Sequence, residues 1–164
     1  MKAALLAVAL GLASSQAFAI TPFSLPWKNA QPSGAQYNTA DHPNGVFVLE
    51  FYANFCGACN DNATNVNALA TAYQGNDRVQ VLDMSLDTSD REISIWISKH
   101  APNHPVLKDG SGTVWDQIHE NYIPTTVVMD CHGDVQLKHT GVWDDAAVQE
   151  IHAAVDGLLA QDCK

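Results

Sequence analysis

The chain has 164 residues and is acidic, with 8 lysine and arginine side chains against 18 aspartate and glutamate side chains and a formal net charge of −10. Nucleic acid is not expected as a partner, because phosphate binding depends on clustered Lys and Arg. After the N-terminal segment, no stretch is apolar over the roughly 20 residues that a transmembrane helix needs, so the mature protein is not expected to be membrane-embedded. This length suits one ordinary domain.

The first 19 residues have the pattern of a cleavable signal peptide. Met1 and Lys2 supply a charged start, residues 3–13 are apolar, and a small-residue region ends at Ala19. This order of regions is typical of secretory signals. We therefore expect cleavage after Ala19 and a mature protein that is periplasmic or secreted. Because disulfides persist outside the cytosol, the four cysteines are interpreted in an oxidising context.

The segment that follows the signal is expected to differ from the rest of the chain. Residues 20–45 are rich in Pro, Gly, Asn and Gln, which predicts an extended N-terminal lead-in with a small hairpin. A single domain is expected over 46–164. It begins with a β-branched and aromatic run over 46–53, which favours a strand buried on both faces, as parallel sheets require. Glu50 is the one charged residue in that run.

The rest of the chain alternates between helix and strand patterns. Apolar residues recur at helical spacing in three segments, 60–73, 89–100 and 144–159. The predicted helices cover 60–73, 89–100, 114–122 and 144–159, and the predicted strands cover 78–86, 105–107, 125–130 and 135–142. This order predicts an α/β fold with a central mixed β-sheet flanked by helices, whose last two strands form a hairpin.

Cys56 and Cys59 lie between the first strand of the domain and the helix that follows it. At a helix N-terminus, unpaired backbone N–H groups and the helix dipole stabilise the thiolate of Cys56, which is the form that attacks disulfides. Cys59 lies one turn further along the same face and can resolve a mixed disulfide. Gly57 and Ala58 are small and leave Cys56 accessible to a protein substrate. The pattern predicts a redox pair that needs no cofactor.

Metal binding is the main alternative for these cysteines. A zinc site would need a second pair at similar spacing, but Cys131 and Cys163 are 32 residues apart. The seven histidines do not pair at ligand spacing within a helix and are interpreted as surface residues, so no metal site is predicted. A copper(I) chaperone that uses Cys56 and Cys59 stays open, since thiolates suit that ion. A binding module with purely structural cysteines also stays open.

Two segments carry a resemblance to a known family. Residues 48–59 read VLEFYANFCGAC and residues 121–126 read NYIPTT, and together they resemble the active-site and cis-proline segments of the thioredoxin superfamily. With the strand and helix inserted between them and the run at 105–109, the chain is most similar to periplasmic thioredoxin-like reductants of cytochrome maturation, here with a CGAC active site. The resemblance implies a thioredoxin-like fold, exported protein substrates with thiols or disulfides, and a membrane electron donor.

The resemblance also implies roles for single residues. Pro124 is expected to be cis and to face the cysteine pair, with the Ile123 backbone pairing with the substrate beside its disulfide. Glu50 occupies the position of a buried acid behind the second cysteine, where it would help to deprotonate Cys59. An ordinary trans proline and a glutamate that points to solvent are the competing interpretations.

The motif departs from the commonest family pattern at two positions. Phe55 replaces the usual Trp before the first cysteine, and Ala58 replaces the Pro of thioredoxin or the His of protein disulfide isomerase. These residues help to set the potential, so the direction of electron flow stays open. The motif contains no cation to stabilise the thiolate strongly, which favours a reductant or isomerase-like enzyme over a strong oxidant.

The remaining two cysteines lie far apart in the sequence. Cys131 lies at the turn of the predicted hairpin, and Cys163 follows the last helix. A strand of about seven residues and a helix of about sixteen both span roughly 24 Å, so a helix that starts at the active-site edge ends near that turn. We therefore predict a structural disulfide between Cys131 and Cys163. A second redox relay and a Cys163 that is free to pair with another chain are the alternatives.

Overall fold

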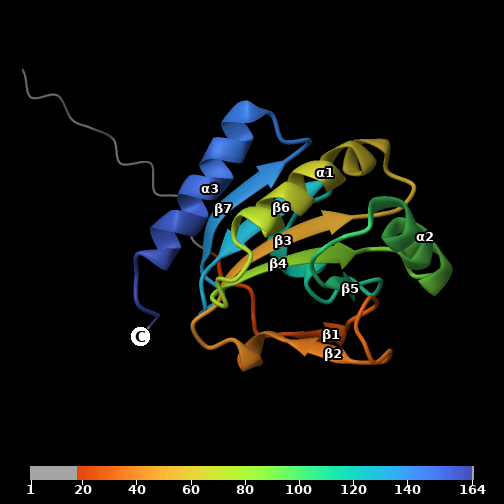
Figure 1. Ribbon diagram of the computed structural model, residues 1–164, viewed down its shortest axis with the longest axis horizontal. Helices are drawn as coiled ribbons and strands as arrows, with labels where there is room; N and C mark the ends of the chain where they lie inside the picture. Colours follow the sequence, from red (N-terminus) through yellow and green to blue (C-terminus); the bar gives the residue numbers. More distant parts are fainter. Residues whose placement is uncertain (1–17, 164) are drawn as a thin grey trace, which may run out of the picture.

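A computed structural model describes residues 18–163 of the chain. Within these residues the central sheet has five strands in the order β5-β4-β3-β6-β7 (Figure 1). Strands β3, β4 and β5 are parallel, and β6 and β7 are antiparallel to their neighbours, so the sheet is mixed as predicted. The strands are β3 (Val46–Tyr52), β4 (Val79–Ser85), β5 (Val106–Lys108), β6 (Thr125–Met129) and β7 (Val135–Thr140).

Strand β3 lies at the centre of the sheet, and all seven of its residues are buried. Successive side chains of a strand point to opposite faces, so Val46, Val48, Glu50 and Tyr52 share one face. Three helices cover that face, α1 (Gly57–Ala72), α2 (Asp90–His100) and α3 (Asp145–Leu159). The even-numbered face of β3 is therefore the helix-covered one, and Glu50 lies beneath helices rather than at solvent.

The N-terminal segment covers the opposite face of the sheet. Strands β1 (Ser24–Pro26) and β2 (Gln36–Asn38) form an antiparallel pair below the sheet, followed by the short 3-10 helix η1 (Thr39–Asp41) (Figure 1). Their apolar side chains join one core with the odd-numbered residues of β3; this core includes Phe23, Leu25, Tyr37, Phe47, Leu49 and Phe51. Residues 20–45 are thus packed against the sheet in addition to forming the expected hairpin.

One predicted element is much shorter than expected. The segment 114–122 contains only a 3-10 helix, η2 (Trp115–Ile118). The Asp109 carboxylate accepts hydrogen bonds from the backbone N–H groups of Val114 (3.1 Å) and Trp115 (2.8 Å), which starts the turn. His119 then adopts a left-handed conformation (φ 51°) that ends it. The prediction of a short helix over 114–122 was therefore wrong in its extent and in its type.

The expected signal peptide lies mostly outside the described part of the chain, because the structure describes only Phe18 and Ala19 of it. Ala19 forms an isolated bridge with Asp134. The Ile20 side chain is buried, and its backbone N–H donates to the carbonyl of Gly133 at 2.9 Å. In residues 18–163, none of the helices has the length and apolar character needed to cross a membrane.

Candidate active site

The sheet and α1 place the first cysteine pair at the carboxyl end of β3. Cys56 is the N-cap residue of α1, and its sulfur accepts a hydrogen bond from the backbone N–H of Cys59 at 3.1 Å. The two cysteines are bonded as a disulfide. Cys56 is half-buried, whereas Cys59 is 1% exposed. An incoming thiol or disulfide can therefore reach only Cys56 directly, and Cys56 lies where helix N–H groups favour a thiolate.

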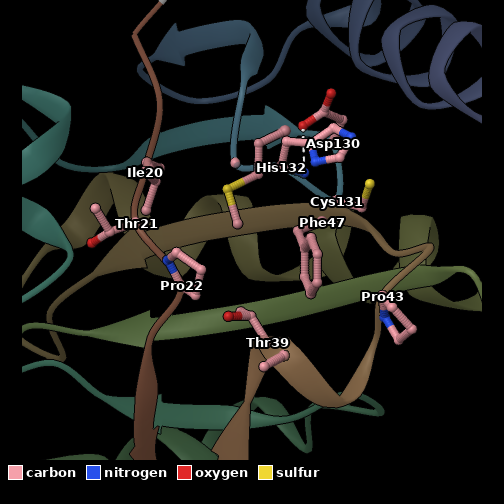
Figure 2. A pocket seen from close by; sticks show the side chains of 12 residues that line it. Ile20, Thr21, Pro22, Thr39, Pro43, Phe47, Asp130, Cys131 and His132 are labelled. Carbon is pink, nitrogen blue, oxygen red and sulfur yellow. Dashed lines mark hydrogen bonds between the residues drawn. The ribbon is translucent and has the colours of Figure 1, made fainter. Parts of the chain in front are cut away.

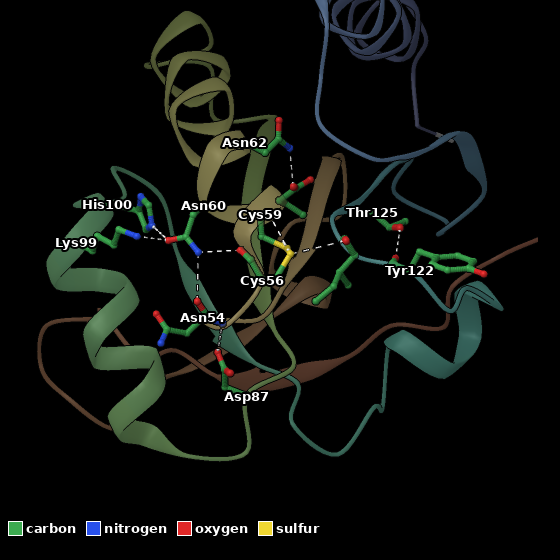
Figure 3. Close-up of a disulfide and its surroundings, with 12 residues drawn as sticks. Asn54, Cys56, Cys59, Asn60, Asn62, Asp87, Lys99, His100, Tyr122 and Thr125 are labelled. Atoms are coloured by element: carbon green, nitrogen blue, oxygen red, sulfur yellow. Dashed lines mark hydrogen bonds between the residues drawn. A yellow bond between two sulfur atoms is a disulfide. The ribbon is translucent and has the colours of Figure 1, made fainter.

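Asn60 fixes the loop that carries Cys56. Its side-chain amide donates to the backbone carbonyls of Asn54 (3.2 Å) and Cys56 (2.8 Å), as Figure 3 shows. Its carbonyl oxygen accepts from Lys99 Nζ at 2.6 Å and lies 2.8 Å from His100 Nε2. The Asn60 amide group therefore ties helix α2 to the loop. Asn60 was not among the residues predicted from the sequence, where its position directly after Cys59 was the only signal available.

The segment before β6 lies across from Cys56. The Ile123–Pro124 peptide bond is cis, and Pro124 is buried. The carbonyl oxygen of Ile123 lies 3.7 Å from the sulfur of Cys56. The segment is held in place by the hydroxyl of Thr125, which donates to the Tyr122 carbonyl at 2.6 Å (Figure 3). A backbone carbonyl and a proline without an N–H thus stand beside the accessible sulfur.

Two aromatic side chains are exposed in the segments on either side of the disulfide. Phe55 is 84% exposed and Tyr122 is 71% exposed, and Gly57 and Ala58 between the cysteines are also exposed. Single exposed apolar residues are common on protein surfaces. Here, however, Phe55 directly precedes Cys56, and Tyr122 directly precedes Ile123, whose carbonyl oxygen lies beside Cys56 Sγ.

Glu50 is buried in β3, with an exposed fraction of 2%. Its carboxylate accepts hydrogen bonds from Asn62 Nδ2 (2.7 Å) and Thr126 Oγ1 (2.6 Å). Burial raises the pKa of Glu50 to about 8; the two hydrogen bonds oppose the rise, and the negative charge of Asp83 adds to it. Asn62 lies one helical turn after Cys59, and both side chains are buried. Glu50 is thus held beneath α1 by Asn62, which lies one turn beyond the buried cysteine.

Trp143 organises the hydrogen bonds around Glu50. Its indole N–H donates to Thr126 Oγ1 at 2.7 Å, and its backbone N–H donates to Asn62 Oδ1 at 3.1 Å. Both groups that bind the Glu50 carboxylate are therefore oriented by one residue before α3. Trp143 is a core residue with 5% exposure, and this polar framework was not predicted from the sequence. A polar Asn62 on the apolar face of a predicted helix was the available signal.

Cys131 and Cys163 lie at the other end of the sheet and are bonded to each other. Beside them is a cavity of about 240 Å³ lined by Ile20, Phe47, His132 and neighbouring residues (Figure 2). One potential ligand atom from each of Cys131, His132 and Cys163 lies within 4.8 Å of the others. The disulfide occupies both sulfurs, so this group is not arranged as a metal site in the described state.

One expectation about the histidines was wrong. His104 is not a surface residue, because it is 8% exposed and its Nε2 lies 3.1 Å from Oδ1 of the buried Asp83. Pro102 separates His104 from His100, so the two do not pair at ligand spacing within a helix, and His104 was predicted to be a surface residue with the other histidines. The segment instead turns inward to begin β5, and this carries His104 against β4.

The mixed sheet, the Cys-x-x-Cys pair at a helix N-terminus and the cis proline opposite it define a thioredoxin-like fold. Solved structures agree. A Chlorobium tepidum protein that carries the name thiol:disulfide interchange protein DsbE has a TM-score of 0.73 and 24% identity, and the match covers 85% of this chain and 96% of that one. A secreted Mycobacterium tuberculosis disulfide oxidoreductase, described as homologous to E. coli DsbE, has a TM-score of 0.65 and 20% identity, with coverage of 82% and 95%.

The sequence matches the AhpC/TSA family over residues 18–138. The chain therefore belongs to the AhpC/TSA family, in its thioredoxin-like fold. A curated relative, the thiol-disulfide oxidoreductase ResA of Halalkalibacterium halodurans, is 23% identical over 106 residues, and the match covers 65% of this chain and 59% of that protein. The chain thus spans about three fifths of the length of this relative.

Proposed function

We propose that the protein is a thiol-disulfide oxidoreductase that exchanges disulfides with exported proteins. The thiolate of Cys56 attacks one sulfur of a substrate disulfide, forms a mixed disulfide and releases the other substrate sulfur as a thiolate. The thiolate of Cys59 then attacks the sulfur of Cys56, which closes the Cys56–Cys59 disulfide and releases the second substrate thiolate. The substrate gains two electrons and the protein loses two. The reverse sequence oxidises a substrate dithiol.

One observation carries this proposal. A half-buried Cys56 caps α1 while bonded to a fully buried Cys59, and the Ile123 carbonyl lies 3.7 Å from the accessible sulfur. This arrangement separates an attacking sulfur from a protected resolving one. It also leaves a backbone acceptor beside the attacking sulfur, where an extended substrate can pair through its N–H. The names of the similar proteins support the same chemistry.

Glu50 supplies the proton transfer in this proposal. Cys59 must lose its proton before it can resolve the mixed disulfide, and a general base works best when its pKa is close to the working pH. With a pKa of about 8, Glu50 can take this proton near neutral pH and return it when the pair is reduced again. Because Asn62 fixes the carboxylate one turn beyond Cys59, the transfer path lies inside the protein.

The electrostatics of the site favour a reductant or isomerase-like enzyme over a strong oxidant. A strong oxidant requires a strongly stabilised thiolate. Here the sulfur of Cys56 accepts one backbone hydrogen bond among the described residues, and the ammonium group of Lys99 on α2 binds the Asn60 side chain. By family resemblance, a membrane protein would supply the electrons. A cleaved signal peptide ending at Ala19 would place the protein in the periplasm or outside the cell.

The reduction potential of the Cys56–Cys59 pair tests the proposal. The mature chain is equilibrated with glutathione or dithiothreitol buffers, and free thiols are quantified with the variant Cys131→Ser/Cys163→Ser as the control that isolates the active pair. A potential near −270 mV would support a reductant, and a value near −120 mV would make the protein an oxidant. Stoichiometric copper(I) binding by Cys56 and Cys59 that survives a competing chelator, without disulfide exchange, would overturn the proposal in favour of a chaperone.

A further inference from the structure

The disulfide between Cys131 and Cys163 lies beside an imidazole group. The two sulfurs and a ring nitrogen of His132 all lie within 4.8 Å of one another. In the described part of the chain, no other group of three or more His, Cys, Asp or Glu residues brings its ligand atoms together in this way. Both cysteines are half-buried and His132 is exposed, so solvent and small ions can reach the group.

The turn between β6 and β7 holds Cys131 and His132 without help from the disulfide. The carboxylate of Asp130 accepts hydrogen bonds from the backbone N–H groups of His132 (2.8 Å) and Asp134 (2.9 Å) (Figure 2). The carbonyl of Asp130 accepts from the Gly133 N–H at 3.1 Å. None of these bonds involves a sulfur atom, so the turn can keep its shape when the disulfide opens.

Arg78 holds the segment that carries Cys163. Its guanidinium group donates hydrogen bonds to the backbone carbonyls of Leu159 and Gln161, each at 2.9 Å. These bonds fix the chain between the end of α3 and the second cysteine. The α-carbons of the two cysteines are 6.2 Å apart, and the hydrogen bonds on both sides keep the cysteines neighbours after reduction.

Reduction converts this group into a set of metal ligands. A dithiol donates two electrons and two protons to the disulfide and becomes a disulfide itself, which leaves Cys131 and Cys163 as thiols. Two thiolates and one imidazole suit a tetrahedral zinc ion, with Zn–S of about 2.3 Å and Zn–N of about 2.0–2.1 Å. Ligand atoms around such an ion lie about 3.5–3.8 Å apart. Side-chain rotations can supply this spacing, because all three atoms already lie within 4.8 Å of one another.

The charges around the group favour a cation in the reduced state. A cavity of about 200 Å³ adjoins it and is lined by Asp130, Asp162, His132 and Cys163. Arg78 is the only Lys or Arg among the described residues that line this cavity, and its guanidinium group donates to backbone carbonyls. Two thiolates would add two negative charges beside the two carboxylates. A divalent ion bound between the sulfurs offsets this added charge.

We propose that the reduced Cys131–His132–Cys163 group is a zinc site. The ion then replaces the disulfide as the link between the β6–β7 turn and the C-terminal segment. Binding displaces the two thiol protons, and water takes the fourth position of the tetrahedron. The inference goes beyond the proposed function, because it uses neither cysteine of the active pair. The same two segments are thus linked by the disulfide under oxidising conditions and by zinc under reducing conditions.

Metal titrations of the reduced protein test the inference. The mature chain with Cys56→Ser/Cys59→Ser is reduced with a phosphine, so that only the second cysteine pair supplies thiols, and Co²⁺ serves as a coloured substitute for Zn²⁺. One equivalent of Co²⁺ should give a thiolate-to-cobalt charge-transfer band and the strong visible bands of a tetrahedral site. One equivalent of Zn²⁺ should remove them. The oxidised protein should show neither band.

Two further measurements separate a built site from loose binding by thiols. His132→Ala should weaken zinc binding at least about tenfold, since the loss of even an outer partner of a ligand has this effect. His119→Asn, at another exposed histidine, is the matched control and should bind zinc as the parent does. Zinc should also raise the urea midpoint of the reduced chain, because it binds the folded state, and should raise it less in His132→Ala.

The inference is overturned if the reduced chain binds no stoichiometric zinc or if His132→Ala binds zinc as tightly as His119→Asn. It is also overturned if cobalt gives the weak bands of a six-coordinate ion, or if adding Cys131→Ser/Cys163→Ser leaves the cobalt spectrum unchanged. A reduced chain that has lost its near-ultraviolet circular dichroism has no preformed site, which would overturn the inference as well. Disulfide exchange by the wild type tests the proposed function separately.

Discussion

Replacing Glu50 with glutamine should make the oxidised protein more stable at alkaline pH. The folded-state pKa of Glu50 is about 8, above its ordinary value of 4.5, mainly because burial disfavours the charged carboxylate. The folded state therefore holds a proton that the unfolded state has lost between these values. Stability must fall as pH rises from about 4.5 to about 8 and then level off, and at 1.36 kcal/mol per pKa unit the total loss is about 5 kcal/mol.

A glutamine at this position stays neutral, so the loss disappears in the variant. Its carbonyl oxygen can still accept from Asn62 Nδ2, although the hydroxyl of Thr126 loses its acceptor. The lost hydrogen bond lowers the stability of the variant by about 1 kcal/mol at all pH values. The variant should therefore be slightly less stable than the wild type at pH 5 and more stable by about 3–4 kcal/mol at pH 9.

Urea unfolding of the oxidised protein at steps from pH 5 to pH 9 measures this difference. The histidines titrate in the same range, so the quantity of interest is the wild-type free energy minus that of the Glu50→Gln variant. Glu150→Gln on the exposed surface of α3 is the control for removal of one negative charge. If the difference between wild type and Glu50→Gln does not change with pH, Glu50 is not a buried acid with a raised pKa, and the reasoning fails.

Three further predictions follow from other parts of the structure. The Cys59→Ser variant should accumulate mixed disulfides with substrate proteins on non-reducing gels, because the accessible sulfur of Cys56 remains. The Cys56→Ser variant should not accumulate them. Equal trapping by both variants would contradict the assignment of Cys56 as the attacking and Cys59 as the resolving cysteine. Cys131→Ser/Cys163→Ser should lower the free energy of unfolding by about 3–4 kcal/mol in the chain-entropy model, and unchanged urea midpoints would refute a stabilising bridge. Ala101→Gly should add about 0.5–1 kcal/mol in the same assay, because the exposed Ala101 has a left-handed conformation (φ 45°) at the C-cap of α2; a loss would show that its methyl group packs.

The sheet and its helices could be predicted from the sequence because local pattern and tertiary environment agree there. The run 46–53 is continuously apolar except for Glu50, and its strand is buried on both faces. The last helix begins with Asp144 as its N-cap, whose carboxylate accepts from the Ala147 N–H at 2.9 Å, as a Ser, Thr, Asp or Asn cap predicts. Capping and periodicity are local properties, so the sequence displays them directly.

The prediction failed where a contact from outside the segment decides its conformation. A short helix was predicted over 114–122, but the Asp109 carboxylate starts a 3-10 turn there and His119 ends it. His104 was predicted to be a surface residue, but it contacts Asp83, which lies 21 residues earlier in a strand that only the folded sheet brings near it. Neither contact has a signature in the spacing of neighbouring residues.

The residues of the candidate site fall into the same two groups: those that a local sequence pattern predicts and those that only the folded chain brings together. Cys56, Cys59 and the proline segment are recognisable because the chemistry requires these residue types at fixed positions in the chain. The groups that hold Glu50 come from α1, β6 and the segment before α3, so their common function exists only in the folded chain. Asn62 and Thr126 each accept a contact from Trp143 and donate to Glu50, which makes a single polar unit from three elements.

The pKa of Glu50 reflects a balance that this polar unit sets. Burial in a strand without donors would keep the carboxyl group protonated at all physiological pH values, and it could then take no proton from Cys59. A direct partner cation would have the opposite effect and leave too weak a base. Two neutral donors, Asn62 and Thr126, offset only part of the desolvation and leave the pKa near 8. The choice of neutral donors over a cation is therefore what places Glu50 in the range where it can exchange a proton with a thiol, whose ordinary pKa is about 8.5.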